Sequence, residues 1–212
     1  MENNNLITVL AVVLVVLSLA GMAVTVAKAS DFRGRITGYE AGYVNITILT
    51  TVSISVSPDT IDFGPGAVDA GKASATVISG DNGTSSVTDG NWSTTGAGGY
   101  GTSIQIANTG NINVTLDISS SSGNANWLCD GSCTGPEYYL MVSDNETGSC
   151  TGGAVGNWIQ ITNGSAVRYC DEFSAITASN TVDLDAKLVV PYDATNSYAA
   201  KSDTLNIVAA AS

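Results

Sequence analysis

The chain of 212 residues contains no histidine. Histidine is the commonest general base in enzymes and the commonest zinc ligand, so its absence excludes the standard hydrolase triads and most zinc sites. The carboxylates are scattered. Asp183 and Asp185 alternate along one predicted strand, where a solvated strand face explains them better than the acid pair of a glycosidase. We therefore predict no catalytic residue, no metal ligand and no cofactor, and we expect that the protein is not an enzyme.

Basic residues are also scarce. Seven Lys and Arg face 19 Asp and Glu, which gives a net charge of −12, and only 12% of the residues are charged. Binding to phosphate backbones needs clustered Lys and Arg, so this composition excludes nucleic acid as a partner. The segment from Gly96 to Gly101 fits G-x-G-x-x-G, but a strand rather than a helix is predicted after it. It therefore predicts a glycine-rich loop and no dinucleotide site.

Charged residues are absent from the run between Leu6 and Ala27, which consists of apolar and small residues and leads into Ala27-Lys28-Ala29. An apolar run that ends in an A-x-A site predicts a helical signal peptide over residues 1–29, and hence export. The run is 22 residues long, enough to span a bilayer if it is not cleaved, so a membrane anchor stays an alternative. Residues 30–43, with three glycines, predict an exposed tether.

Apolar and polar residues alternate in segment after segment behind this leader, while helical periodicity is nearly absent. This period of two is typical of half-buried strands. The pattern recurs over residues 112–118 and 182–188, and more briefly around Ile104, Ile159 and Leu205. It predicts an all-β protein, an antiparallel β-sandwich of jelly-roll or Ig-like type over residues 44–212. The longest alternating segment places its apolar face on Val44, Ile46, Ile48, Val52, Ile54 and Val56.

The four cysteines are Cys129, Cys133, Cys150 and Cys170. An even number in an exported chain predicts two disulfides, whereas a four-cysteine zinc site prefers C-x2-C pairs that are missing here. Four cysteines allow three connectivities, of which we favour Cys129–Cys133 with Cys150–Cys170. All four lie in a region of about residues 120–175, which we expect to be an insertion added to the sandwich.

Six Asn-X-Ser/Thr sequences are candidates for surface N-glycosylation. The alternation places Asn45 and Asn113 on the polar faces of their strands, where a glycan would point to solvent. Four aromatic residues near the cysteines, Trp127, Tyr138, Tyr139 and Trp158, admit two interpretations, and we favour core packing over a platform that binds surface glycans. The six glycosylation candidates are Asn45, Asn82, Asn91, Asn113, Asn145 and Asn163.

Three segments resemble those of a known family: SPDTIDFG from Ser57, IANTGNINVTL from Ile106 and SDTLNI from Ser202. Together they are similar to the camelysin/TasA group of fibre-forming surface proteins and to its archaeal bundling-pilus relatives. The resemblance implies a jelly-roll-like sandwich that is exported by a signal peptide. It also implies donor-strand complementation, in which the N-terminal strand of one subunit completes a sheet of the next.

We therefore expect a structural cell-surface protein, a subunit of an extracellular filament or coat that self-associates by β-strand donation. The alternating segment from Val44 to Val56 is the candidate assembly strand, because an alternating strand beside a mature N-terminus can add to an open sheet edge. The alternative is an adhesin or binding module with an Ig-like domain, held in the membrane through the uncleaved run from Leu6 to Ala27.

Overall fold

A computed structural model describes residues 49–80, 85–93, 101–129, 133–196 and 201–212. The predicted leader, 1–29, and the tether, 30–43, lie outside the described residues, as does most of the glycine-rich segment before Gly101. Within the described part of the chain, no helix has the length and apolar character needed to cross a membrane.

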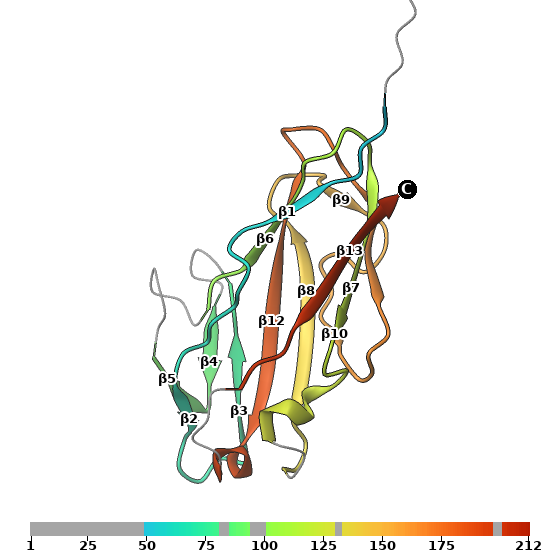
Figure 1. The fold of residues 1–212 in the computed structure, drawn as a ribbon. Coiled ribbons are helices and arrows are strands. Elements are labelled where there is room, and N and C mark those ends of the chain that lie inside the picture. The colour runs from blue at the N-terminus through green and yellow to red at the C-terminus, as the bar shows by residue number, and fades with distance from the viewer. Residues whose placement is uncertain (1–48, 81–84, 94–100, 130–132, 197–200) are drawn as a thin grey trace, which may run out of the picture. The chain divides into compact units, whose positions relative to one another are not determined.

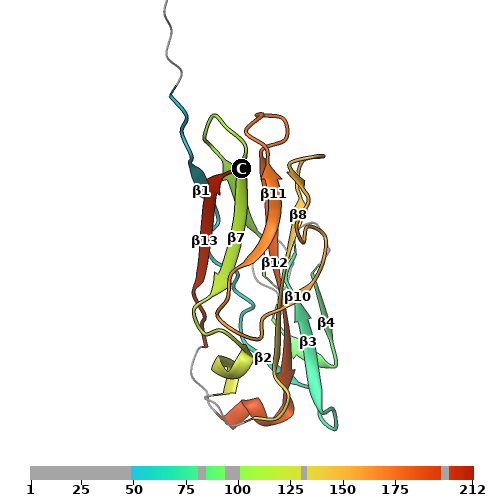
Figure 2. The same cartoon turned by 90° about the vertical axis from the view of Figure 1, so that its right-hand side faces the viewer.

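Antiparallel strands make up nearly all of the regular structure and pack as a sandwich, which confirms the predicted all-β class (Figures 1 and 2). One sheet contains β1 (Ile54–Val56), β3 (Ser74–Ile78), β4 (Ser86–Thr88), β6 (Ile104–Asn108), β8 (Glu137–Asp144), β10 (Ile159–Gln160) and β12 (Thr181–Pro191). The facing sheet has the order β13 (Leu205–Ala211), β7 (Val114–Ser120), β11 (Val167–Phe173) and β9 (Cys150–Thr151). The remaining elements are the pair β2 (Gly66–Val68) and β5 (Gly90–Trp92) and the short helices η1 (Ala125–Cys129) and η2 (Tyr192–Asn196).

Strand β12 lies at the centre of the larger sheet. It pairs with β8 over residues 182–189, with β6 over 181–184 and with β3 over 187–191. Its predicted apolar positions point into the sandwich, where Val182 and Leu184 are completely buried with Leu116 and Ile118 of β7. Each fully buried Leu or Ile contributes about 1.5–3 kcal/mol, and a slip of one residue would expose the whole row. The alternation therefore fixes the register of this strand.

Asp185 does not lie on a solvated strand face as we predicted. It is only 7% exposed, and its Oδ1 accepts hydrogen bonds from Ser103 Oγ (2.6 Å) and Ser79 Oγ (3.2 Å). Along one edge, β12 pairs first with β6 and then with β3, and Asp185 lies between the two pairings. Ser79 directly follows β3 and Ser103 directly precedes β6, so both hydroxyls come from this gap. Hydrogen bonds to a carboxylate offset the cost of burying it.

The region predicted as an insertion, about residues 120–175, supplies strands to both sheets. β8 pairs with β12, and β11 lies between β7 and β9. Tyr169 and Phe173 of β11 are completely buried in the common core. These residues therefore belong to the sandwich itself.

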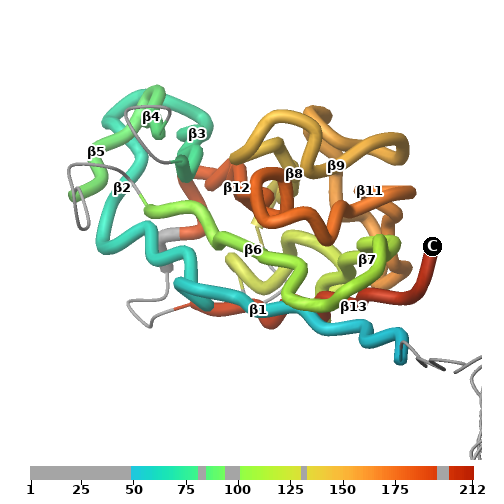
Figure 3. The backbone as a smooth tube through the Cα atoms, turned by 90° about the horizontal axis from the view of Figure 1, so that it is seen from above, coloured from blue at the N-terminus to red at the C-terminus, as the bar shows by residue number. Residues whose placement is uncertain are grey.

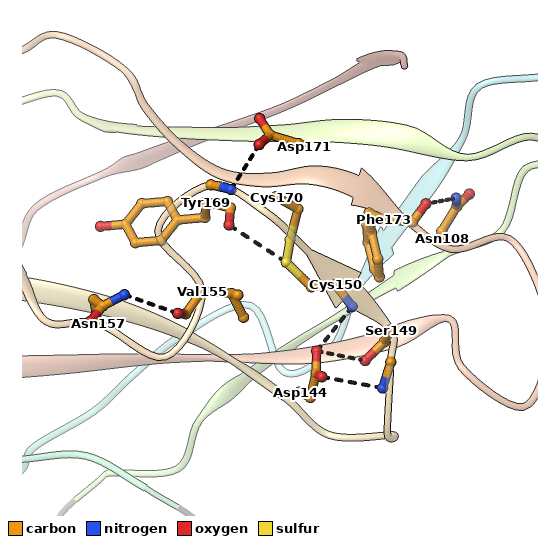
Figure 4. The surroundings of a disulfide bond; sticks show 12 residues. Asn108, Asp144, Ser149, Cys150, Val155, Asn157, Tyr169, Cys170, Asp171 and Phe173 are labelled. Carbon is orange, nitrogen blue, oxygen red and sulfur yellow. Dashed lines mark hydrogen bonds between the residues drawn. A yellow bond between two sulfur atoms is a disulfide. The ribbon is translucent and has the colours of Figure 1, made fainter.

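Both disulfides have the connectivity that we favoured, Cys129–Cys133 and Cys150–Cys170. The second joins β9 to β11 inside the core, as Figure 4 shows. Asp144, at the end of β8, accepts a hydrogen bond from Cys150 N (2.9 Å) and so fixes the turn into β9. Two disulfides are typical of proteins that mature in an oxidising, extracellular compartment.

Candidate functional site at the edge strand β13

Strand β13 is a long, regular edge strand. It pairs with β7 without a register shift, from Leu205 opposite Ser120 to Ala211 opposite Val114. Its sequence, LNIVAAA, contains no charge and no proline, the usual devices that protect an edge from pairing with another chain. Among the described strands, β1 and β4 have three residues and β9 and β10 have two. β13 is therefore the edge best suited to receive an added strand.

The hydrogen-bond pattern shows which groups of β13 are available. In an antiparallel pair, residues alternate between those that bond to the partner strand and those that point away from it. Ser121 N donates to Thr204 O (2.8 Å), and Ser212 N donates to Asn113 O (3.4 Å). Even-numbered residues of β13 thus bond to β7, and the N–H and C=O groups of odd-numbered residues such as Ala209 point away. No strand of the described residues pairs with β13 on that side.

The core is also incompletely covered along β13. Leu205, Ile207 and Ala209 point toward the core but are only half-buried, although their neighbours Leu116 and Ile118 on β7 are completely buried. Apolar surface that stays in contact with water is unfavourable by about 25 cal/mol per Å². An additional strand beside β13 would therefore gain apolar contacts as well as backbone hydrogen bonds.

Strand β1 forms the edge of the other sheet on the same side of the sandwich (Figures 2 and 3). Ile54 and Val56 are half-buried against the core, whereas Val52 is 43% exposed. The other candidate assembly residues, Val44, Ile46 and Ile48, lie outside the described residues. The described part of the predicted long strand, residues 49–56, is thus a strand only over β1.

The opposite side of the sandwich is closed by residues 150–161. Gly156 N donates to Val142 O of β8 (2.7 Å), and Ala154 N donates to Arg168 O of β11 (3.2 Å). This segment therefore bridges the edges of both sheets, and the Cys150–Cys170 disulfide fixes its start. No comparable segment among the described residues covers β13, so the two sides of the sandwich differ.

The chain enters the sandwich through a clamp made by Asn111. The Nδ2 of Asn111 donates to Leu49 O (2.7 Å), and its Oδ1 accepts from Thr51 N (2.7 Å). Its backbone N donates to Thr51 O (3.1 Å), and Thr109 N donates to Ser53 O (2.9 Å). Residues 49–53 are therefore held along the loop between β6 and β7, although Leu49 is 77% exposed.

Asn108, at the end of β6, fixes the loop between β6 and β7 that contains Asn111. This side chain is 1% exposed and donates from Nδ2 to Ile112 O and Phe173 O, both at 3.0 Å. A Cβ on Gly110 would collide with the backbone oxygen of Thr51, so the close approach needs glycine. From the sequence, the Asn-Thr-Gly-Asn segment was noted only as part of the family resemblance. Its role in holding residues 49–53 becomes visible only in the structure, which brings the two segments together.

Replacing Asn111 by alanine is expected to release residues 49–53. The two side-chain hydrogen bonds contribute about 0.5–1.5 kcal/mol each, so exchange of the Thr51 amide hydrogen should become about tenfold faster. Amide hydrogen exchange measured by NMR checks this. Asn113→Ala is the matched control, because the Asn113 side chain accepts from Ala175 N and no hydrogen bond among the described residues joins it to residues 49–53. An unchanged exchange rate at Thr51 in Asn111→Ala would contradict the clamp.

Asp203 fixes the start of β13. It accepts hydrogen bonds from Ser120 Oγ (2.7 Å), Ser121 Oγ (3.0 Å) and Ser122 N (3.0 Å). Burial alone would raise the pKa of Asp203, but these hydrogen bonds outweigh it and hold the pKa below its ordinary value. The carboxylate thus ties β13 to the end of β7.

The four aromatic residues near the cysteines separate into two pairs. Trp127 and Tyr138 pack edge to face with ring centroids 5.8 Å apart, and Tyr138 belongs to the core, as we favoured for the group. Tyr139 instead lies on the outer face of the sheet, with Lys187 Nζ 3.8 Å from its ring centroid and 5.2 Å from that of Trp158. Lys187 thus covers the Tyr139 ring in a cation–π contact. Tyr139 and Trp158 therefore do not form an open platform.

The described residues include no group of three or more His, Cys, Asp or Glu that could hold a metal ion. Comparison with known proteins finds no matching protein-family model, no matching curated protein and no matching solved structure. The similarity to the camelysin/TasA group therefore stays a prediction.

Proposed function

We propose that the protein is a structural subunit of an extracellular filament or coat, and that the segment before residue 49 of one copy adds as a strand to β13 of the next. The supporting observation is the edge of β13: seven uncharged residues with a half-buried apolar row, and outward backbone groups that pair with no strand of the described residues. Strand addition at such an edge supplies affinity through backbone hydrogen bonds and register through alternate side chains.

The chemistry of the donated segment fits this edge. Val44, Ile46 and Ile48 alternate with polar residues, and none of residues 43–50 carries a charge. In an added strand, these three apolar side chains would lie beside the half-buried row of Leu205, Ile207 and Ala209 and extend the apolar surface over the core. Two copies each carry a net charge of −12 and repel one another elsewhere, so an uncharged contact is where they can associate.

The position of the clamp supports donation to another copy. Leu49 is bonded to Asn111, and the last residue, Ser212, is bonded to Asn113, so both lie at the same end of the sandwich. The segment before Leu49 therefore starts from the end at which β13 finishes. Because Asn111 holds residues 49–53, tension on the donated segment would pass into the loop before β7.

Deletion of residues 30–48 tests the proposal, because it leaves every described strand in place. We expect the exported protein to fold and to form no filaments by negative-stain electron microscopy. A finer test compares two double variants that each add two carboxylates. The first, Ile46→Asp with Ile48→Asp, changes the apolar face, and the control, Asn45→Asp with Thr47→Asp, changes the opposite face. The first pair should prevent assembly and the second should weaken it far less. Unchanged filaments in the deletion variant would exclude strand donation by this segment.

The second candidate is a surface binding module that keeps the run from Leu6 to Ala27 as an anchor. The length of that run, 22 residues, favours it, since this is enough to cross a bilayer. The mass of the purified native protein separates the two, because a subunit with a free donor segment begins at Ser30 and an anchored module retains residues 1–29.

A further inference from the structure

The structure separates the N-glycosylation candidates by their surroundings. Asn45 and Asn82 lie outside the described residues. The other four asparagines are all exposed, but two have sequons that include residues of a paired strand and two have sequons in loops or turns. Asn91 lies in β5 and Asn113 directly precedes β7, so we call their sequons the strand sequons; the loop sequons are those of Asn145 and Asn163.

Asn163 lies in the loop between β10 and β11. Residues 162–166 are all exposed, so every residue of Asn-Gly-Ser is open to solvent. The Oδ1 of Asn163 accepts a hydrogen bond from Ser165 N (2.9 Å), which forms a local Asx turn. Its Nδ2 has no hydrogen-bond partner among the described residues and is free to react.

Asn145 lies in the turn that follows β8, and both Asn145 and Thr147 are exposed. Its Nδ2 donates one hydrogen bond, to Asp183 Oδ2 (2.7 Å). An amide nitrogen carries two hydrogens and N-glycosylation replaces one, so this bond can persist beside a glycan. The bond also holds the side chain in one orientation.

The strand sequons are less accessible. Thr115, the hydroxyl residue of the Asn113 sequon, is 8% exposed, and Val114 is completely buried. In the other sequon, Asn91 is paired with Ala67 and Ser93 N donates to Pro65 O (3.0 Å). An enzyme could take either segment into its active site only by separating paired strands, which costs their ladder hydrogen bonds and packing.

We propose that Asn145 and Asn163 carry N-linked oligosaccharides that are attached to the folded protein. The donor is a lipid-linked oligosaccharide whose first sugar is esterified to phosphate. A bond forms between Nδ2 and the anomeric carbon, the bond from that carbon to the phosphate oxygen breaks, and the phosphate leaves with the electron pair. The amide nitrogen gives up one proton. The proposal requires export but does not require strand donation.

Both sites are compatible with the free edge of β13. Asn145 follows β8, next to the start of the segment 150–161. Asn163 lies between β10 and β11, where its loop approaches Gly123 after the end of β7. Neither lies on β1 or β13. Glycans at these two positions would therefore be attached to residues that take no part in the pairing of either strand.

Glycopeptide mass spectrometry of the protein purified from the cells that produce it tests the proposal. We expect Asn145 and Asn163 to be modified in most copies, with an occupancy several times that of Asn91 and Asn113. Thr147→Ala should remove the glycan from Asn145 alone and Thr147→Ser should keep it, while an intact disulfide pattern shows that both variants fold. Unmodified Asn145 and Asn163, or equal occupancy at all four sites, would overturn the proposal. Occupied loop sites on a protein that forms no filaments would refute strand donation alone.

Discussion

Ala209→Pro is expected to abolish filament formation while the individual subunit stays folded. Proline has no backbone N–H, and the N–H of Ala209 points away from β7, so the substitution removes no hydrogen bond of the subunit. It does remove a donor from the free edge, and the proline ring obstructs an incoming strand there. Negative-stain electron microscopy checks assembly, and circular dichroism with thermal unfolding checks the fold.

Ala210→Pro is the matched control, one residue along the same strand. The N–H of Ala210 points toward β7, where Ala210 is paired with Thr115, so its removal leaves a ladder acceptor unsatisfied. This variant should lose about 1–3 kcal/mol of folding free energy. Ala209→Pro should unfold close to the temperature of the unmodified protein. Normal filaments from Ala209→Pro would show that the donated strand pairs at another edge.

Much of the fold follows from the sequence because the apolar alternation is local. The stripes of β7, β12 and β13 each predicted a strand with the correct buried face, since a strand with period two has one way to cover its apolar side. Strand β11 was missed because register shifts after Arg168 and Cys170 interrupt its alternation. Asp185 was misplaced because the two hydroxyls that cover it come from residues 82 and 106 positions away.

The candidate site was only half predictable for the same reason. The donor segment has its own pattern in the sequence, whereas the acceptor edge exists only because β13 pairs with β7 and no other described strand follows it. The same holds for the clamp: Asn111 binds residues about sixty positions earlier in the chain, and a short Asn-Thr-Gly-Asn segment gives no sign of that partner. A site that depends on which strands are neighbours in a sheet can be recognised only once the sheet topology is known.

Replacing both Cys150 and Cys170 by alanine is expected to destabilise the sandwich more than removal of the other disulfide. The disulfide closes a loop with a sequence separation of 20, and that of Cys129–Cys133 is 4. Loop-closure entropy predicts a loss of about 3 kcal/mol for the first bond and about 2 kcal/mol for the second. Urea unfolding of the two double-alanine variants measures the free energies of unfolding directly.

The two variants should also differ in how they associate. Without Cys150–Cys170, residues 150–161 lose their covalent attachment to β11 and are held only by hydrogen bonds, so the edges of β8 and β11 that they cover should open more often. A subunit whose edges open on both sides can pair in more than one way, so a larger share of irregular aggregates beside the filaments is expected. The Cys129–Cys133 variant keeps the closed side and should still form ordered filaments at temperatures below its unfolding transition. Ordered filaments from the Cys150/Cys170 variant would show that the asymmetry between the two sides does not direct assembly.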